Sequence, residues 1–318
     1  MTWHQRAIPW ALSLAVLLVV WAPTQVHAEE DFFEPAALGM GGAVRTLGPD
    51  TSAIHLNPAS MVTKARYLTS FSYSHYGREK SHLLSTGAYD SKTSNFALGT
   101  KYSLRIFEPP FSADRDVPWY PVSSDTEIRD KRRFHRWDVA AAYAFLQRRL
   151  NVGLTARVLR KEYEIRENRV RFSMDSGFNV FPLPVLGISV SSQNMIPTND
   201  DRYPTRLAAG LGLMLDPVLQ LGVDVVWDFT SSEKPTTDVH GGLEVRILNL
   251  FAIRGGYYSD RQFTDNYATW GVGLASDRIK ISFSMRIELG PIDHTLREDV
   301  SDATNRLWNT IGFEVAFL

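Results

Sequence analysis

Histidine is the residue type in this 318-residue chain that most readily transfers protons or binds metal ions. The chain contains eight His and no Cys, so thiol chemistry and thiolate metal sites are excluded. Four of the histidines, His75, His82, His135 and His240, fall near the ends of alternating β-like segments. None has a recognisable Ser partner motif, and the H-x-x-x-H spacing of a zinc site does not occur. We therefore expect no enzyme, no metal site and no cofactor.

Charged residues of both signs form a second set with chemical potential. They recur among Gly, Ala and Ser on one side of the alternating segments. Small residues with a few ions of both signs suit a crowded, enclosed interior better than a solvated surface. We predict that such an interior is lined by Lys101, Asp138, Arg157, Asp175, Asp224, Glu244, Arg246 and Arg254.

The elements that must position these side chains are β-strands. From residue 66 to the end of the chain, apolar residues alternate with small or charged ones. The segment LQLGVDVVWDF (219–229) places Leu, Val, Trp and Phe on one face and mainly Gln, Gly and Asp on the other. Strict alternation of this kind predicts a strand with one apolar face.

Counting such segments gives about fourteen strands, an even number typical of bacterial outer-membrane barrels. Very short turns alternate with longer polar loops, and in such barrels the short turns face the periplasm. The predicted strands span 67–76, 80–90, 94–104, 134–146, 150–163, 170–180, 185–195, 203–215, 218–229, 237–247, 250–259, 266–276, 278–288 and 306–317. We therefore predict an all-β fold, a transmembrane antiparallel β-barrel formed by 66–318.

A soluble β-sandwich or periplasmic barrel is the alternative, because its strands also alternate. The solvated face of a sandwich would carry Lys, Glu and Thr, whereas here the face opposite the apolar one is rich in Gly, Ala and Ser. Aromatic residues also gather near the strand ends, as in the interfacial girdles of membrane barrels. Both observations favour the membrane barrel.

The first 28 residues predict a secretory signal peptide that directs export of the protein through the Sec pathway. They contain Arg6, an apolar core of about a dozen residues, too short to span a bilayer, and a small-residue cleavage pattern ending at Ala28. Without this segment the chain has 33 basic and 35 acidic groups, which does not indicate a nucleic-acid partner. The predicted location is the outer membrane of a Gram-negative cell, with outer-membrane lipid as a partner.

The glycine-rich segment ALGMGGAVRTLGPDTSAIHLNPASM (37–61) lacks strand alternation. A barrel of about fourteen strands is too wide for its own side chains to fill. We therefore predict that 29–65 forms an N-terminal plug, with a short helix over 51–57 that begins at Asp50-Thr51-Ser52 and is ended by Asn57-Pro58. A periplasmic tail without order is the alternative.

The motifs G-M-G-G-A, D-x-x-A and N-P-A of this segment resemble the start of the long-chain fatty acid transporter (FadL) superfamily, which includes the PorV-type barrels of type IX secretion. The segments DSGFNVFPLPVLGISVSSQNM and YPTRLAAGLGLML look closer to the PorV-type branch. The resemblance implies a fourteen-stranded barrel plugged by its N-terminal segment. It implies plug or gating roles for Gly39, Gly41, Gly42, Asp50, Asn57, Pro58 and Ala59.

The resemblance leaves two functions open. The first is a conduit for hydrophobic small molecules across the outer membrane, with such a molecule as ligand. The second is a plugged scaffold or shuttle that docks a secretion-machinery or surface protein. A lipid-modifying enzyme is the least favoured function. The basic run RDKRRFHRW (129–137) could bind lipopolysaccharide phosphates, or it could be the solvated base of a loop.

Overall fold

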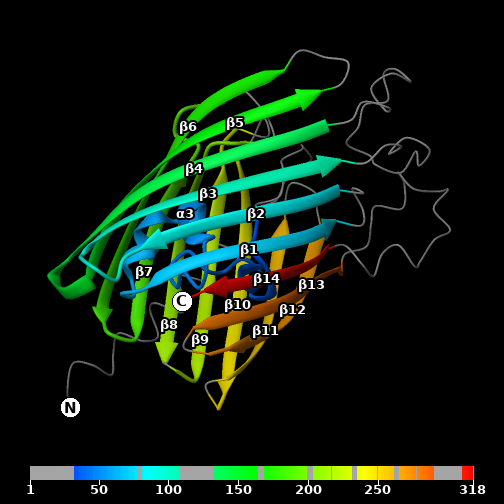
Figure 1. Cartoon of the computed structure of the whole chain (residues 1–318). Coiled ribbons are helices and arrows are strands. Elements are labelled where there is room, and N and C mark those ends of the chain that lie inside the picture. Colours follow the sequence, from blue (N-terminus) through cyan, green and yellow to red (C-terminus); the bar gives the residue numbers. More distant parts are fainter. Residues whose placement is uncertain are drawn as a thin grey trace.

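The computed structural model describes residues 32–76, 81–107, 132–163, 168–198, 203–215, 217–230, 235–248, 250–260, 265–276, 278–289 and 310–317. Fourteen antiparallel strands pair with their sequence neighbours, and β1 pairs with β14, so the sheet closes on itself (Figure 1). The prediction of a fourteen-stranded antiparallel barrel is confirmed. The predicted signal peptide lies outside the described residues.

The strands begin and end close to their predicted positions. Their bounds are β1 Tyr67–Tyr76, β2 Ser81–Asp90, β3 Phe96–Phe107, β4 Arg132–Phe145, β5 Leu150–Tyr163, β6 Arg169–Leu183, β7 Leu186–Gln193, β8 Arg206–Leu215, β9 Leu219–Asp228, β10 Thr236–Ile247, β11 Phe251–Asp260, β12 Asp265–Ala275, β13 Ile279–Glu288 and β14 Thr310–Phe317. β3 and β6 each end three residues later than predicted and β8 begins three residues later, while 306–309 of the last predicted strand lie outside the described residues. The end of β6 contains a register shift between Val180 and Leu183, which carries the strand through Pro182.

The outward faces of the strands carry large apolar side chains. Phe71, Leu98 and Trp137 are more than half exposed, at 55%, 58% and 56%. Their inward neighbours along each strand are small or polar, such as Ser72 and Lys101. An apolar band that encircles the whole sheet would aggregate in water and is suited to hydrocarbon. Among the described helices, none has the length and apolar character needed to cross a bilayer.

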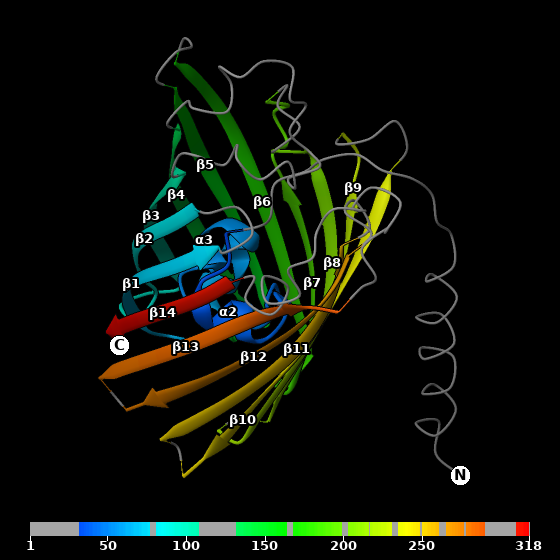
Figure 2. The ribbon, with the colours of Figure 1, turned by 90° about the vertical axis from the view of Figure 1, so that its right-hand side faces the viewer.

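The segment 32–66 lies inside the barrel (Figure 2), where nearly all of its side chains are buried. It contains α2 (Pro35–Gly39), α3 (Ala53–Leu56) and a 3₁₀ helix, η2 (Pro58–Val62). Below we call it the inner segment. Helix α2 lies against β11 to β14, whereas η2 lies against β3 to β6.

The predicted helix over 51–57 is shorter in the structure, where α3 spans Ala53–Leu56, and a second short helix, η2, follows it. Asn57 is extended, with φ −159° and ψ 97°, so α3 stops before it. Its side chain then accepts a hydrogen bond from Ala59 N, and Pro58 provides a first helical position that needs no donor. The Asn57-Pro58 pair therefore ends α3 and begins η2. The sequence prediction considered only that a proline disfavours helix at the residue before it, so it did not include the second helix.

Candidate functional site

The glycine-rich turn of the inner segment runs directly against the barrel wall. Gly41 and Gly42 have φ of +62° and +75°, a conformation that L side chains rarely adopt. A Cβ on Gly41 would lie 2.8 Å from the backbone of Tyr257 and from the carbonyl oxygen of Gly241. The Gly41 carbonyl oxygen lies 2.8 Å from His240 Nδ1. Backbone thus approaches backbone here, which only glycine permits.

The Asn-Pro-Ala turn meets the opposite side of the wall. Asn57 Nδ2 donates to the Arg45 carbonyl oxygen at 2.8 Å and to Asn179 Oδ1 on β6 at 2.6 Å. A Cβ added to Gly153 of β5 would lie 2.6 Å from both Ala59 N and the Pro58 carbonyl carbon. One buried amide therefore ties two parts of the inner segment to the wall, and a wall glycine makes room for the turn.

Asp50 joins the two halves of the inner segment. One carboxylate oxygen accepts from Ala37 N at 3.0 Å, and the other accepts from Ser52 N at 2.8 Å. The residue is fully buried. Because each oxygen satisfies a backbone donor near a helix, Asp50 holds α2 and α3 in one compact unit. Gly39 lies at the end of α2, where a Cβ would be 3.3 Å from Arg254 and Gly271.

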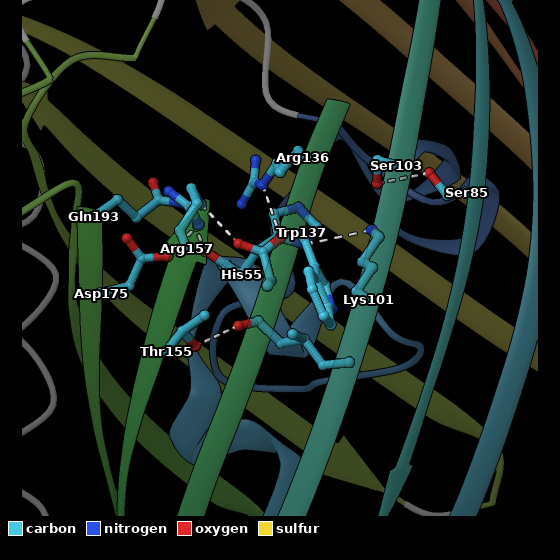
Figure 3. Close-up of polar contacts among 12 residues, drawn as sticks. His55, Ser85, Lys101, Ser103, Arg136, Trp137, Thr155, Arg157, Asp175 and Gln193 are labelled. Atoms are coloured by element: carbon cyan, nitrogen blue, oxygen red, sulfur yellow. Dashed lines mark hydrogen bonds and ion pairs between the residues drawn. The ribbon is translucent and has the colours of Figure 1, made fainter. Parts of the chain in front are cut away.

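An ion-pair network crosses the interior at the level of the inner segment (Figure 3). Arg157 on β5 is at its centre, with Nε 2.7 Å from Asp138 and a further contact to Asp175. Arg136 also binds Asp138, at 2.8 Å. All four side chains are more than nine-tenths buried. Such a network fixes β4, β5 and β6 relative to one another, because removing one member would leave its partners charged and buried.

A second network lies across the barrel around Glu244 of β10. Its carboxylate binds Arg254 of β11 at 2.6 Å and Arg246 at 2.7 Å. The structure thus places all eight of the predicted lumen-lining residues on inward-facing positions: Lys101, Asp138, Arg157, Asp175, Asp224, Glu244, Arg246 and Arg254. Arg246 is the least buried of them and lies near the short-turn end.

Polar and charged residues of the inner segment pair with other inward-facing wall residues, and the sequence analysis did not identify them. Glu34 binds Lys101 at 2.6 Å, and Arg45 lies 3.6 Å from Asp224. His55 Nδ1 is 3.4 Å from Lys101 Nζ. The sequence did offer one indication of these pairs: the residues lie in the predicted plug, where they would be buried, and a buried charge needs a partner. The pairing itself depends on contacts between residues at least 46 positions apart in the sequence.

The pKa of His55 is lowered well below its usual value of 6.5. Burial is the largest cause, and the positive charges of Lys101, Arg136, Arg157 and Arg45 act in the same direction. The imidazole is therefore neutral inside the barrel. As a neutral ring it can accept a hydrogen bond from Lys101.

The histidines considered for catalysis lie in two different environments. His75, His82 and His135 sit on the outward face, where Tyr73 OH is 2.6 Å from His82 Nδ1 and Tyr102 OH is 2.7 Å from His135 Nδ1. His240 faces inward and stacks on Tyr258 with ring centroids 5.4 Å apart. His82 and His135 thus form polar pairs with tyrosines, and His75 lies against His82 with ring centroids 4.8 Å apart, an arrangement typical of a membrane interface.

Comparison with known proteins gives a likeness of structure without a likeness of sequence. No protein-family model matches the chain, and no curated protein matches it. The toluene transporter TodX of Pseudomonas putida superposes with a TM-score of 0.68 at 10% identity, covering 92% of this chain and 99% of that one. The toluene transporter TbuX of Ralstonia pickettii gives 0.59 at 12% identity, covering 90% and 97%. A FadL homologue of Pseudomonas aeruginosa gives 0.56 at 11%, covering 93% and 98%.

These superpositions cover at least 90% of this chain and at least 97% of the other. The likeness to the PorV-type branch stays a prediction. The predicted resemblance to the FadL superfamily is confirmed at the level of fold: this chain has the architecture of the FadL-type outer-membrane barrels.

Proposed function

We propose that this protein is an outer-membrane barrel that conducts hydrophobic small molecules. The observation that carries the proposal is the near-complete superposition on two toluene transporters, at 90% or more of this chain. The apolar outer band supports a location in lipid, and the closed sheet satisfies the backbone hydrogen bonds that hydrocarbon cannot. Outer-membrane lipid is then the partner of the outer face, and a hydrophobic molecule is the ligand of the interior.

In this proposal the residues 29–65 act as a plug. The described part, 32–65, supports this role because it is buried and bound to opposite sides of the wall. The glycine turn of Gly39, Gly41 and Gly42 would be the contact to β10–β12, and the Asn57-Pro58-Ala59 turn the contact to β5 and β6. Movement of either turn would open a path past the plug, so these residues are our gating candidates.

The test is uptake by Gram-negative cells that produce the protein. Such cells should take up radiolabelled hydrophobic compounds several-fold faster than cells carrying an empty vector. Entry of a polar solute of similar size should stay at the vector level, because the plug blocks an open aqueous pore. Unchanged uptake of every hydrophobic compound, together with a stoichiometric outer-membrane protein partner after purification, would instead support the scaffold function.

A further inference from the structure

The basic run RDKRRFHRW (129–137) is divided between the two faces of the barrel wall. The structure describes its residues 132–137, which form the start of β4 at the end of the barrel with the long connections. Successive residues of a strand point to opposite faces, so Arg133, His135 and Trp137 face outward. Figure 1 shows β4 between β3 and β5 in the wall. The described part of the run is therefore a strand with one face toward the membrane, rather than the base of a loop.

The outward side chains of β3 to β5 change character in a fixed order toward this end. Near the middle of the strands they are apolar, as at Val139 and Leu154, which are exposed. In the next row of β4, Trp137 lies opposite Tyr102, and Trp137 Nε1 donates to Thr100 Oγ1 at 2.9 Å. Tryptophan and tyrosine collect at the boundary between hydrocarbon and headgroups. These two rings therefore mark the level at which the headgroup region begins.

The outward residues beyond these rings are charged. In the pairing of β4 with β5, His135 lies opposite Arg160. One position pair further along, Arg133 lies opposite Glu162. Arg160 Nη2 is 2.9 Å from one carboxylate oxygen of Glu162, and His135 Nε2 is 3.3 Å from the other. Tyr102 OH lies 2.7 Å from His135 Nδ1, so the imidazole has a polar neighbour on both sides. We call Arg133, His135, Arg160 and Glu162 the outer polar patch.

The cations of the outer polar patch are accessible. The Arg160 side chain is 54% exposed and Arg133 is also exposed, whereas the Glu162 side chain is 28% exposed. Two guanidiniums and one carboxylate leave one positive charge in excess at neutral pH. A guanidinium has five N–H donors, of which one carboxylate contact uses only a part. The patch therefore attracts a further anion and has donors to bind it.

The same level on the opposite side of the barrel is uncharged. We compare the last two outward positions before the long connections in β10, β11 and β12, all of which the structure describes. They hold Thr237, Val239, Tyr257, Ser259, Asn266 and Ala268. Tyr257 OH donates to Asn266 Oδ1 at 2.8 Å, a polar contact of the interface that uses no ion. The charges of the outer polar patch are therefore not a feature that every strand has at this level.

We propose that the outer polar patch binds a phosphate group of lipopolysaccharide in the outer leaflet. In bacterial barrels the longer connections face the cell exterior, so the patch lies at the headgroup level of that leaflet. A phosphate accepts parallel hydrogen bonds from a guanidinium, and Arg133 and Arg160 offer two guanidiniums on adjacent strands. The acyl chains of the same molecule lie on the apolar rows beyond Trp137. The inference rests on the outer-membrane location and is independent of the proposed conduit function.

The experiment measures binding of fluorescent lipid A, the phosphorylated anchor of lipopolysaccharide, to the purified full-length protein in detergent. The second probe is the same lipid without its phosphates. Lipid A should bind at least about tenfold more tightly than the dephosphorylated lipid. Arg133→Gln together with Arg160→Gln should weaken lipid A about tenfold and leave the dephosphorylated lipid unchanged. The matched control is Lys92→Gln together with Arg278→Gln, which removes two exposed charges at the short-turn end and should change neither affinity.

All four substituted residues are exposed, so each variant should fold, and circular dichroism checks that its strands are retained. Millimolar inorganic phosphate should leave lipid A bound, because the acyl chains also contact the apolar band. Complete displacement would indicate a site for free phosphate and would overturn the inference. Equal affinity for the two lipids, or unchanged affinity of the Arg133→Gln and Arg160→Gln protein, would overturn it as well. Uptake of hydrophobic compounds by cells producing that variant should stay normal, which separates this test from that of the conduit.

Discussion

Cationic side chains at two levels of the barrel interior have different partners. At the level of the inner segment, Arg157 and Arg254 bind buried carboxylates at 2.7 and 2.6 Å. Toward the long connections, Arg105 and Lys161 lie over aromatic rings instead. A guanidinium bound to carboxylates is neutralised and locks strands together, whereas a cation over rings is also held by the aromatic surface. The first arrangement therefore depends on ion pairs between strands, and the second depends also on aromatic packing.

Among the changes that test this comparison, replacement of Arg157 should lower the free energy of unfolding most. Arg157→Met leaves Asp138 and Asp175 buried with one cation fewer, which costs about 3–5 kcal/mol of unfolding free energy. Denaturant unfolding in detergent micelles measures the loss. Arg160→Gln is the matched control on the same strand, because its side chain is 54% exposed and outward-facing. It should cost at most about 1 kcal/mol. An equal, small effect of both changes would mean that the buried network is not what holds this level together.

Filling the space beside the Asn-Pro-Ala turn should be next in size. Gly153→Val puts a side chain where Pro58 and Ala59 now lie, with an expected cost of about 1–3 kcal/mol. The proposed plug should shift, and entry of small polar solutes into reconstituted vesicles should rise. Gly255→Val is the control, because nothing lies within 4 Å of its added Cβ. Normal assembly with unchanged permeability in Gly153→Val would contradict the sealing role.

Asn57→Ala should give an effect of similar size at the same turn. It removes the hydrogen bonds to the Arg45 carbonyl oxygen and to Asn179, and it leaves Ala59 N without its side-chain acceptor. The expected loss is about 1–3 kcal/mol, most of it from the buried groups left unsatisfied. Vesicle permeability and unfolding should change together. A change in stability alone would show that the turn supports the fold without controlling passage.

The smallest predicted effect is a pH dependence that comes from His55. Because the pKa of His55 in the folded protein is below 6.5, lowering the pH through this value protonates the imidazole in the unfolded chain before it does so in the folded chain. The contribution of His55 to stability is therefore fully present above about pH 6.5 and is lost progressively as the pH falls below it. His55→Gln should flatten this part of the curve. The measured quantity is the difference between the two proteins, since nearby carboxylates such as Glu34 are common to both.

The strands were predictable because their information is local. Alternation located β1 and β5 to the residue, since each outward side chain contacts lipid and each inward one contacts a crowded interior. Alternation missed the last residues of β3 and β6, because Arg105 interrupts the expected small residues near the end of β3 and Pro182 breaks the strand pattern near the end of β6.

The sequence by itself determined the strand number, the two faces of the sheet and the separate character of residues 37–61. These features follow from period-two patterning and from glycine, and both are readable one segment at a time. Tertiary structure alone decided which charges meet, such as Arg45 with Asp224 across 179 residues, and which cations lie on rings. Barrel closure brings together side chains that no local pattern connects, so the interior chemistry became visible only in the folded protein.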